Sequence, residues 1–218
     1  MMEELTLIQK LAVWALPVIF AITLHEVAHG WVANKLGDPT AKMLGRITLN
    51  PIKHIDPLGT IIVPGVLLAL GGFVFGWAKA VPITPNNFKK PRQGMAIVAV
   101  AGPASNFLMA LFWAAILKTG LVLQTSQPDI GQFLIYSGVA GVTINLVLMV
   151  LNLLPIPPLD GSRVASWLMP KKWAYYYLRY ENYGFIVLIA LLFLGFLTPF
   201  ILGPFSFFQH WIYSIFHI

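Results

Sequence analysis

Residues 11–33 read LAVWALPVIFAITLHEVAHGWVA, an apolar run long enough to cross a bilayer, which takes about 20 residues. Its only ionisable side chains are those of His25, Glu26 and His29. A run of this length and apolarity predicts a transmembrane helix. Ionisable groups inside a membrane are costly unless they pair with one another or carry a function. The same run therefore predicts both the fold class and the place of a functional site.

The composition of the whole chain agrees with a membrane protein. Of the 218 residues, 58% are hydrophobic and only 10% are charged, which is more apolar surface than a soluble protein of this length buries. The chain contains no cysteine, which excludes disulfides, cysteine-ligated zinc and thiol nucleophiles. Its net charge of +6 comes from basic residues that flank apolar segments, as topology signals do. We therefore expect a lipid bilayer, and no nucleic acid, as a partner.

Further apolar runs set the number of expected spans. Runs of spanning length lie at 8–34, 94–117, 132–153 and 184–202. Another apolar region at 60–78 is interrupted by proline and glycine, and the aromatic tail at 201–218 is either a short last span or an interfacial helix. The pattern predicts an all-α polytopic membrane protein with about five transmembrane helices. We expect one membrane-embedded domain over 1–218, with a core at about 8–165 and C-terminal helices at about 183–218.

The sequence HEVAH at residues 25–29 has the H-E-x-x-H spacing of a metal site. Residues four apart lie on one face of a helix, so His25 and His29 are placed to bind the same ion. Glu26 is then positioned to act as a general base on water. The pattern also occurs by chance on solvated surfaces, but its apolar surroundings here favour a metal site.

A third protein ligand is needed for a catalytic zinc site, and the helix itself offers none. Val32 and Lys35 stand where an extended H-E-x-x-H-x-x-G-x-x-H motif needs glycine and histidine. The remaining candidates are Asp38, Asp56, Asp129, Asp160, His54, His210 and His217.

Asp160 has the most distinctive surroundings of these candidates. It lies in NLLPIPPLDG (152–161), where three prolines favour an extended backbone and Gly161 permits a sharp turn. Irregular backbone at membrane depth is tolerated where it is buried or lines a cavity. The alternative is a loop that ends a helix through an Asx-type turn.

Three motifs together resemble the signatures of the site-2 protease family, the intramembrane zinc metalloproteases. They are HEVAH on a membrane helix, AGPASN at 101–106 and NLLPIPPLDG at 152–161. The stretches GRITLNPIKHIDPLGT (45–60) and FGWAKAVPITP (75–85) resemble the compact prokaryotic branch that has no PDZ or CBS domain. The resemblance extends from about residue 20 to residue 165.

The resemblance implies a function and a set of site residues. His25, His29 and Asp160 would bind one Zn²⁺ per chain, and Glu26 would activate water. Asn152 would hold the substrate or the oxyanion. The expected activity is hydrolysis of peptide bonds within transmembrane segments of other membrane proteins, which is regulated intramembrane proteolysis.

Two further polar residues have structural interpretations. Asn106 follows the small residues of AGPASN, so an interhelical hydrogen bond is favoured over a direct part in catalysis. His54 lies in a polar loop and is expected to support the structure rather than to bind the metal.

The ligand positions constrain the topology. Unless the chain folds deeply back into the membrane, His29 and Asp160 meet when the first helix and the helix at 132–153 run parallel, which requires one or three spans between them. The segment 60–78 is therefore predicted to be re-entrant, and the resemblance implies that it is partly β.

This layout leaves only Lys10 and Lys118 on one side of the membrane and places all other lysines and arginines on the opposite side. The positive-inside rule then puts the N-terminus outside a prokaryotic cell membrane and the active site toward the cytosol.

Other interpretations remain open at this point. A non-hydrolytic membrane metal-binding or transport protein would also place histidine and aspartate within the bilayer. An inactive scaffold is a third class, although the intact set of candidate ligands argues against it. Regulation falls either to a membrane partner protein or to the tail at 184–218 acting as a gate.

Overall fold

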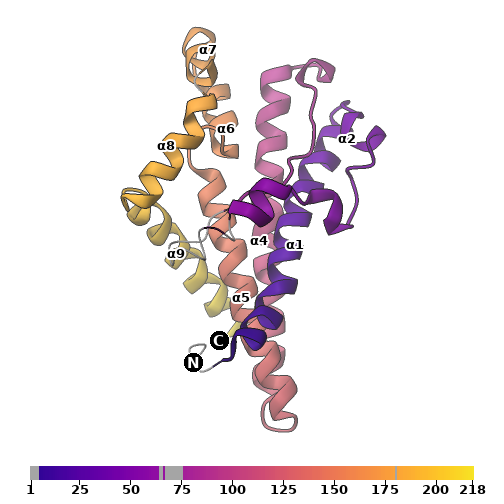
Figure 1. The fold of residues 1–218 in the computed structure, drawn as a ribbon, viewed down its shortest axis with the longest axis vertical. Helices are drawn as coiled ribbons and strands as arrows, with labels where there is room; N and C mark the ends of the chain where they lie inside the picture. Colours follow the sequence, from indigo (N-terminus) through magenta and orange to yellow (C-terminus); the bar gives the residue numbers. More distant parts are fainter. Residues whose placement is uncertain (1–4, 64–65, 67–75, 180) are drawn as a thin grey trace. The chain divides into compact units, whose positions relative to one another are not determined.

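The computed structural model describes residues 5–63, 66, 76–179 and 181–218 of the chain (Figure 1). The chain forms two compact units. The first unit consists of Met1–Ala21, Pro103–Leu153 and Leu197–Ile218, and the second consists of Ile22–Gly102 and Leu154–Phe196. Two long helices contribute to both units, namely α1 (Leu7–Lys35) and α4 (Pro91–Leu123).

The first unit is a helical core in which α5 (Pro128–Leu153) contacts α9 (Thr198–Phe216) (Figure 1). Trp113, Leu146 and Ile212 lie in its buried cluster. Asn106 makes buried polar contacts in this unit, since its side-chain amide donates to the Ala21 carbonyl at 3.1 Å and to Asn145 Oδ1 at 2.9 Å. The interhelical hydrogen bond predicted for Asn106 is confirmed.

The second unit combines the C-terminal part of α1 and the N-terminal part of α4 with several short elements. These are α2 (Thr40–Met43), a 3₁₀ turn η1 (Pro51–His54), a π-helical turn η2 (Pro57–Ile62), a 3₁₀ turn η3 (Pro85–Asn87), α6 (Asp160–Leu168), α7 (Lys171–Arg179) and α8 (Glu181–Phe193). Ala33, Phe88 and Val98 form the buried apolar cluster that joins α1 to α4. Helix α6 contacts α7, and α7 contacts α8 (Figure 1).

Asp38 fixes the chain that follows α1. Its buried carboxylate accepts hydrogen bonds of 2.5–3.1 Å from the N–H and hydroxyl of Thr40, the N–H of Thr84 and the side-chain amide of Asn87. Burial raises the pKa of the Asp38 carboxyl, but these hydrogen bonds outweigh it and hold the pKa below its ordinary value. The ionised side chain therefore ties residues 84–87 to the end of α1.

Three helices in the described part of the chain are long and apolar enough to cross a membrane, namely α1, α4 and α5. Helices α8 and α9 meet the same criterion only as a pair with a break between them. The chain is therefore a multi-pass membrane protein built from helices.

The break between the last two helices does not fall where the apolar runs suggested. The expected run at 184–202 is divided, because α8 ends at Phe193 and α9 begins at Thr198. Gly195 adopts φ 74°, its N–H donates to the Leu192 carbonyl, and the next N–H donates to the Leu191 carbonyl. This is the Schellman arrangement that ends helices, and glycine adopts its left-handed conformation without strain.

The predicted re-entrant segment at 60–78 lies mostly outside the described residues. Its first described residues, to Ile62, belong to the helical turn η2, and residues 76–78 have no regular secondary structure. Within residues 5–63, 66, 76–179 and 181–218 there is no β-strand.

Candidate metal centre

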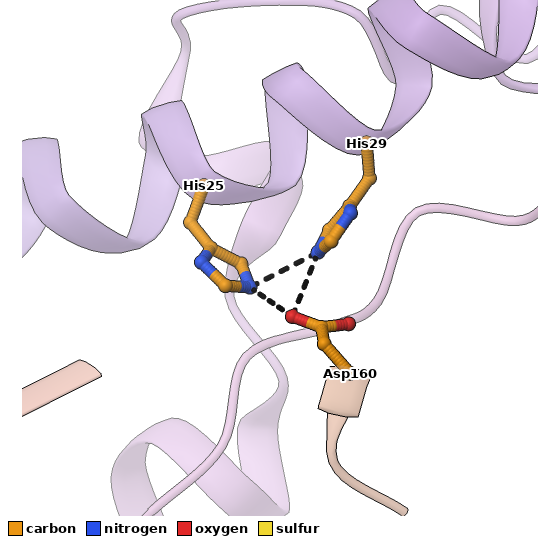
Figure 2. A group of neighbouring side chains, drawn as sticks. All are labelled: His25, His29 and Asp160. Carbon is orange, nitrogen blue, oxygen red and sulfur yellow. Dashed lines mark hydrogen bonds and ion pairs between the residues drawn. The ribbon is translucent and has the colours of Figure 1, made fainter. Parts of the chain in front are cut away.

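Two imidazoles and one carboxylate converge in the second unit (Figure 2). His25 and His29 lie four residues apart on α1, and their Nε2 atoms are 3.0 Å apart. Asp160 Oδ2 lies 3.2 Å from His25 Nε2 and 3.3 Å from His29 Nε2. The three residues selected from the sequence are thus brought together by the fold.

His29 is oriented as a metal-binding histidine would be. Its Nδ1–H donates a 2.8 Å hydrogen bond to the backbone carbonyl of Val98 on α4. This bond keeps the proton on Nδ1, so that Nε2 presents its lone pair toward Asp160. The hydrogen bond also fixes the plane of the ring, as is typical of metal-binding histidines.

The space between these side chains is kept open by Gly102. A Cβ atom at this position would lie 2.5 Å from His25 Cε1 and from His29 Nε2, closer than real Cβ contacts allow. Apart from these ion-pair contacts with the two imidazoles, the buried Asp160 Oδ2 has no hydrogen-bond partner in the described structure. An unsatisfied buried oxygen beside two imidazole nitrogens fits a cation, and two nitrogens with one carboxylate match the ligand set of a catalytic zinc.

Asp160 reaches this position because it begins a helix. The chain leaves α5 at Leu153, passes through the proline-rich residues 154–159 and enters α6 at Asp160. Gly161 was expected at a sharp turn, but it lies buried in the first turn of α6. Asp160 therefore stands at the first position of a helix, not in an Asx-type turn.

Glu26 is held by the chain that follows the undescribed residues 67–75. Its Oε2 accepts a 2.8 Å hydrogen bond from the backbone N–H of Val81. Lys79 N–H donates to the carbonyl of His54, and Trp77 N–H donates to the carbonyl of Gly59. Residues 76–84 are thus anchored along their length, with the Glu26 carboxylate as one of the anchors.

Three of the other candidate ligands have different roles in the described structure. His54 is buried, with Nε2 3.0 Å from the Thr48 carbonyl, which agrees with a supporting role. Asp38 forms the hydrogen-bonded anchor after α1, and Asp56 accepts from Gly59 N–H at the start of η2. Among the described residues, the group that could hold a metal consists of His25, His29 and Asp160.

Asn152 lies near the end of α5, where its side-chain amide donates to the Leu148 carbonyl of the same helix. It belongs to the first unit, whereas the three ligands belong to the second. Its expected contact with the substrate or the oxyanion stays a prediction.

Three contributors to the site were not found from the sequence. Val98 and Val81 act through backbone atoms, which every residue type offers, so no residue-type signal marks them. Gly102 belongs to AGPASN, whose small residues were considered only in connection with the interhelical hydrogen bond of Asn106. The structure shows that a side chain at this position would collide with both imidazoles, so the glycine keeps space for the two histidines.

Comparison with known proteins identifies several relatives of this chain. The chain is 42% identical over 187 residues to "Putative zinc metalloprotease YwhC" of Bacillus subtilis, a match that covers 84% of this chain and 78% of that protein. A Rip2 protein of Mycolicibacterium smegmatis with the same description is 30% identical over 175 residues, 80% of this chain and 64% of the relative.

A more distant match is the "Regulator of sigma-E protease RseP" of Escherichia coli, 36% identical over 98 residues. These residues are 42% of this chain and 21% of that protein. No family model matches the chain. No solved structure matches it either. The extensive similarity to YwhC, together with the converging ligands, shows that the chain belongs to the site-2 protease family of intramembrane zinc metalloproteases.

Proposed function

We propose that this chain is a zinc endopeptidase that hydrolyses peptide bonds within the transmembrane segments of other membrane proteins. The observation that carries the proposal is the convergence of His25, His29 and Asp160 in a protein whose described residues include three candidate membrane spans. The relatives named as zinc metalloproteases support the choice of metal and of reaction. One Zn²⁺ per chain matches the one group of ligands found among the described residues.

Bound zinc supplies Lewis-acid chemistry, because it lowers the pKa of water to about 7 and polarises a carbonyl group. The two imidazoles and the Asp160 carboxylate hold the ion. Glu26 takes the proton from the attacking water and passes it to the leaving amine. Since its Oε2 accepts from Val81 N–H, the orientation of this carboxylate is fixed while Oε1 is left for the proton. Asn152 donates a hydrogen bond where negative charge develops on the substrate carbonyl.

Residues 76–84 form an extended edge to which the substrate backbone binds. The N–H groups of Trp77, Lys79 and Val81 all donate to the protein itself, an alternation typical of an extended chain. The N–H groups of the intervening residues Ala78 and Ala80 donate to no partner in the described structure. An extended substrate segment pairs with this edge, which exposes peptide bonds that a helix would cover.

The experiment that tests the function uses purified protein reconstituted in lipid vesicles with a tagged single-span substrate. The substrate carries a helix-breaking Asn-Pro pair in its membrane segment, because an intact helix is not open to hydrolysis. We expect a new N-terminus within the membrane segment, and no product after the metal has been removed with a chelator. Stoichiometric zinc binding without cleavage of any such substrate would instead identify a metal-binding or transport protein.

We also propose that the metal centre lies toward the cytosolic side of the membrane, with the N-terminus outside. The basic residues after α1 and before α4 support this orientation. Because the chain has no cysteine, single cysteines report it cleanly. Exposed Lys53→Cys and Lys90→Cys should be labelled by a membrane-impermeant maleimide only from the cytosolic side, and Thr125→Cys only from outside. Labelling of Lys53→Cys and Lys90→Cys from opposite sides would contradict the proposal.

A further inference from the structure

Arg92, the second residue of α4, contacts the far end of the helix that carries Asp160. Its Nη2 donates to the backbone carbonyls of Ser166, of Trp167 at 3.3 Å and of Met169 at 2.6 Å. These carbonyls belong to the last turn of α6 and to the residue after it. One guanidinium group therefore caps the C-terminal end of α6.

This contact has a strong influence on the position of so short a helix. The last carbonyls of a helix have no partner within it and carry partial negative charge, which a cation near the C-terminus stabilises. A helix of nine residues is marginal on its own, so its position depends on contacts with neighbours. It is also about 13 Å long and stiff, so holding one end limits the movement of the other. The other end of α6 is Asp160.

The same stretch of α4 also positions the two histidines. Val98 accepts from His29 Nδ1, and Gly102 leaves the space at both imidazoles. Residues 92–102 of α4 thus contact the histidines directly and the Asp160 helix through Arg92. The relative position of the three ligands is set by one rigid element.

We propose that Arg92 is a positioning residue of the metal centre, which holds α6 against α4 and thereby places the Asp160 carboxylate at the two imidazoles. This inference rests on the proposed zinc function. It predicts that Arg92 affects metal binding only through Asp160. That dependence distinguishes it from a general contribution to stability.

The test is a double-mutant cycle on zinc affinity, measured by competition with a chromophoric chelator on the full chain in detergent. Arg92→Met keeps the apolar stem and removes the donors, and we expect it to weaken zinc binding about 10- to 100-fold. In the Asp160→Ala background the same change should alter the residual affinity less than about twofold. Arg92→Lys should recover part of the loss, because an ammonium group still reaches a carbonyl.

Lys90→Met is the matched control, since it removes an exposed basic side chain for which the described structure shows no hydrogen bond, while the backbone carbonyl that accepts from Gly94 N–H is kept. It should leave zinc affinity unchanged. Wild-type affinity in Arg92→Met, or an equal loss with and without Asp160, would overturn the inference while leaving the zinc site intact. A wild-type chain that binds no zinc would overturn the proposed function, and the inference with it.

Discussion

Glu26→Gln should reduce the rate of substrate cleavage by about 10²- to 10⁴-fold while the zinc content stays at the wild-type level. The magnitude is that of a general acid–base group removed from a reaction. Glutamine has the shape of glutamate and retains an oxygen that accepts from Val81 N–H, so the local structure should persist. It has no carboxylate to take a proton from water.

The measurement compares single-turnover cleavage in vesicles with zinc content on the same protein preparation. Glu181→Gln is a suitable control, because it removes another carboxylate from the second unit, one that pairs with Arg163 at 2.5 Å. That pair is partly exposed, so its loss should change the cleavage rate only a few-fold. Cleavage by Glu26→Gln at the wild-type rate would mean that the base is another group. Loss of zinc from this variant would mean that Glu26 is a ligand.

Gly102→Ala should greatly weaken zinc binding. The added methyl group would occupy the space beside His25 and His29, where its distances to ring atoms would be 2.5–2.6 Å. Overpacking of this kind costs about 1–3 kcal/mol in a well-packed interior, and here it is relieved by moving the ligands. We expect zinc affinity to fall at least about 100-fold, by analogy with the loss of groups that orient metal ligands.

Gly94→Ala separates this effect from overpacking alone. Gly94 lies on the same helix, and a Cβ there would lie 2.6 Å from ring atoms of Phe88, not from a metal ligand. We expect Gly94→Ala to lower the melting temperature and to retain zinc. Zinc affinities that fall equally in both variants would show that Gly102 acts through general packing. Normal zinc binding in Gly102→Ala would contradict the described geometry of the site.

The metal ligands could be selected from the sequence because their chemistry depends on residue type and spacing. His25 and His29 are four residues apart on a helix, and this spacing alone places both rings on one face. Asp160 was selected from the prolines before it and from the family resemblance, although no spacing connects it with residues 25–29. The fold brings it there through α6, an element that the apolar runs did not predict.

The remaining features escaped prediction for identifiable reasons. The hydrogen bonds from Val81 N–H and to the Val98 carbonyl use backbone groups, which leave no trace in the sequence. The division near residue 195 was obscured because Leu194 and Phe196 continue the apolar run across it, while Gly195 ends the helix. Pro199 lies in the first turn of α9, where a missing N–H costs nothing.

The most direct test of the central claim is the zinc content of detergent-purified protein, measured for the wild type, His25→Ala and Asp160→Ala. The three ligand atoms lie within 4.8 Å of one another, so each variant should lose the metal. We expect about one zinc per chain in the wild type and close to none in either variant as purified, because the residual affinity of two ligands is too weak to keep the metal through purification. Retention of zinc by Asp160→Ala would remove the third ligand and contradict a single site shared by α1 and α6.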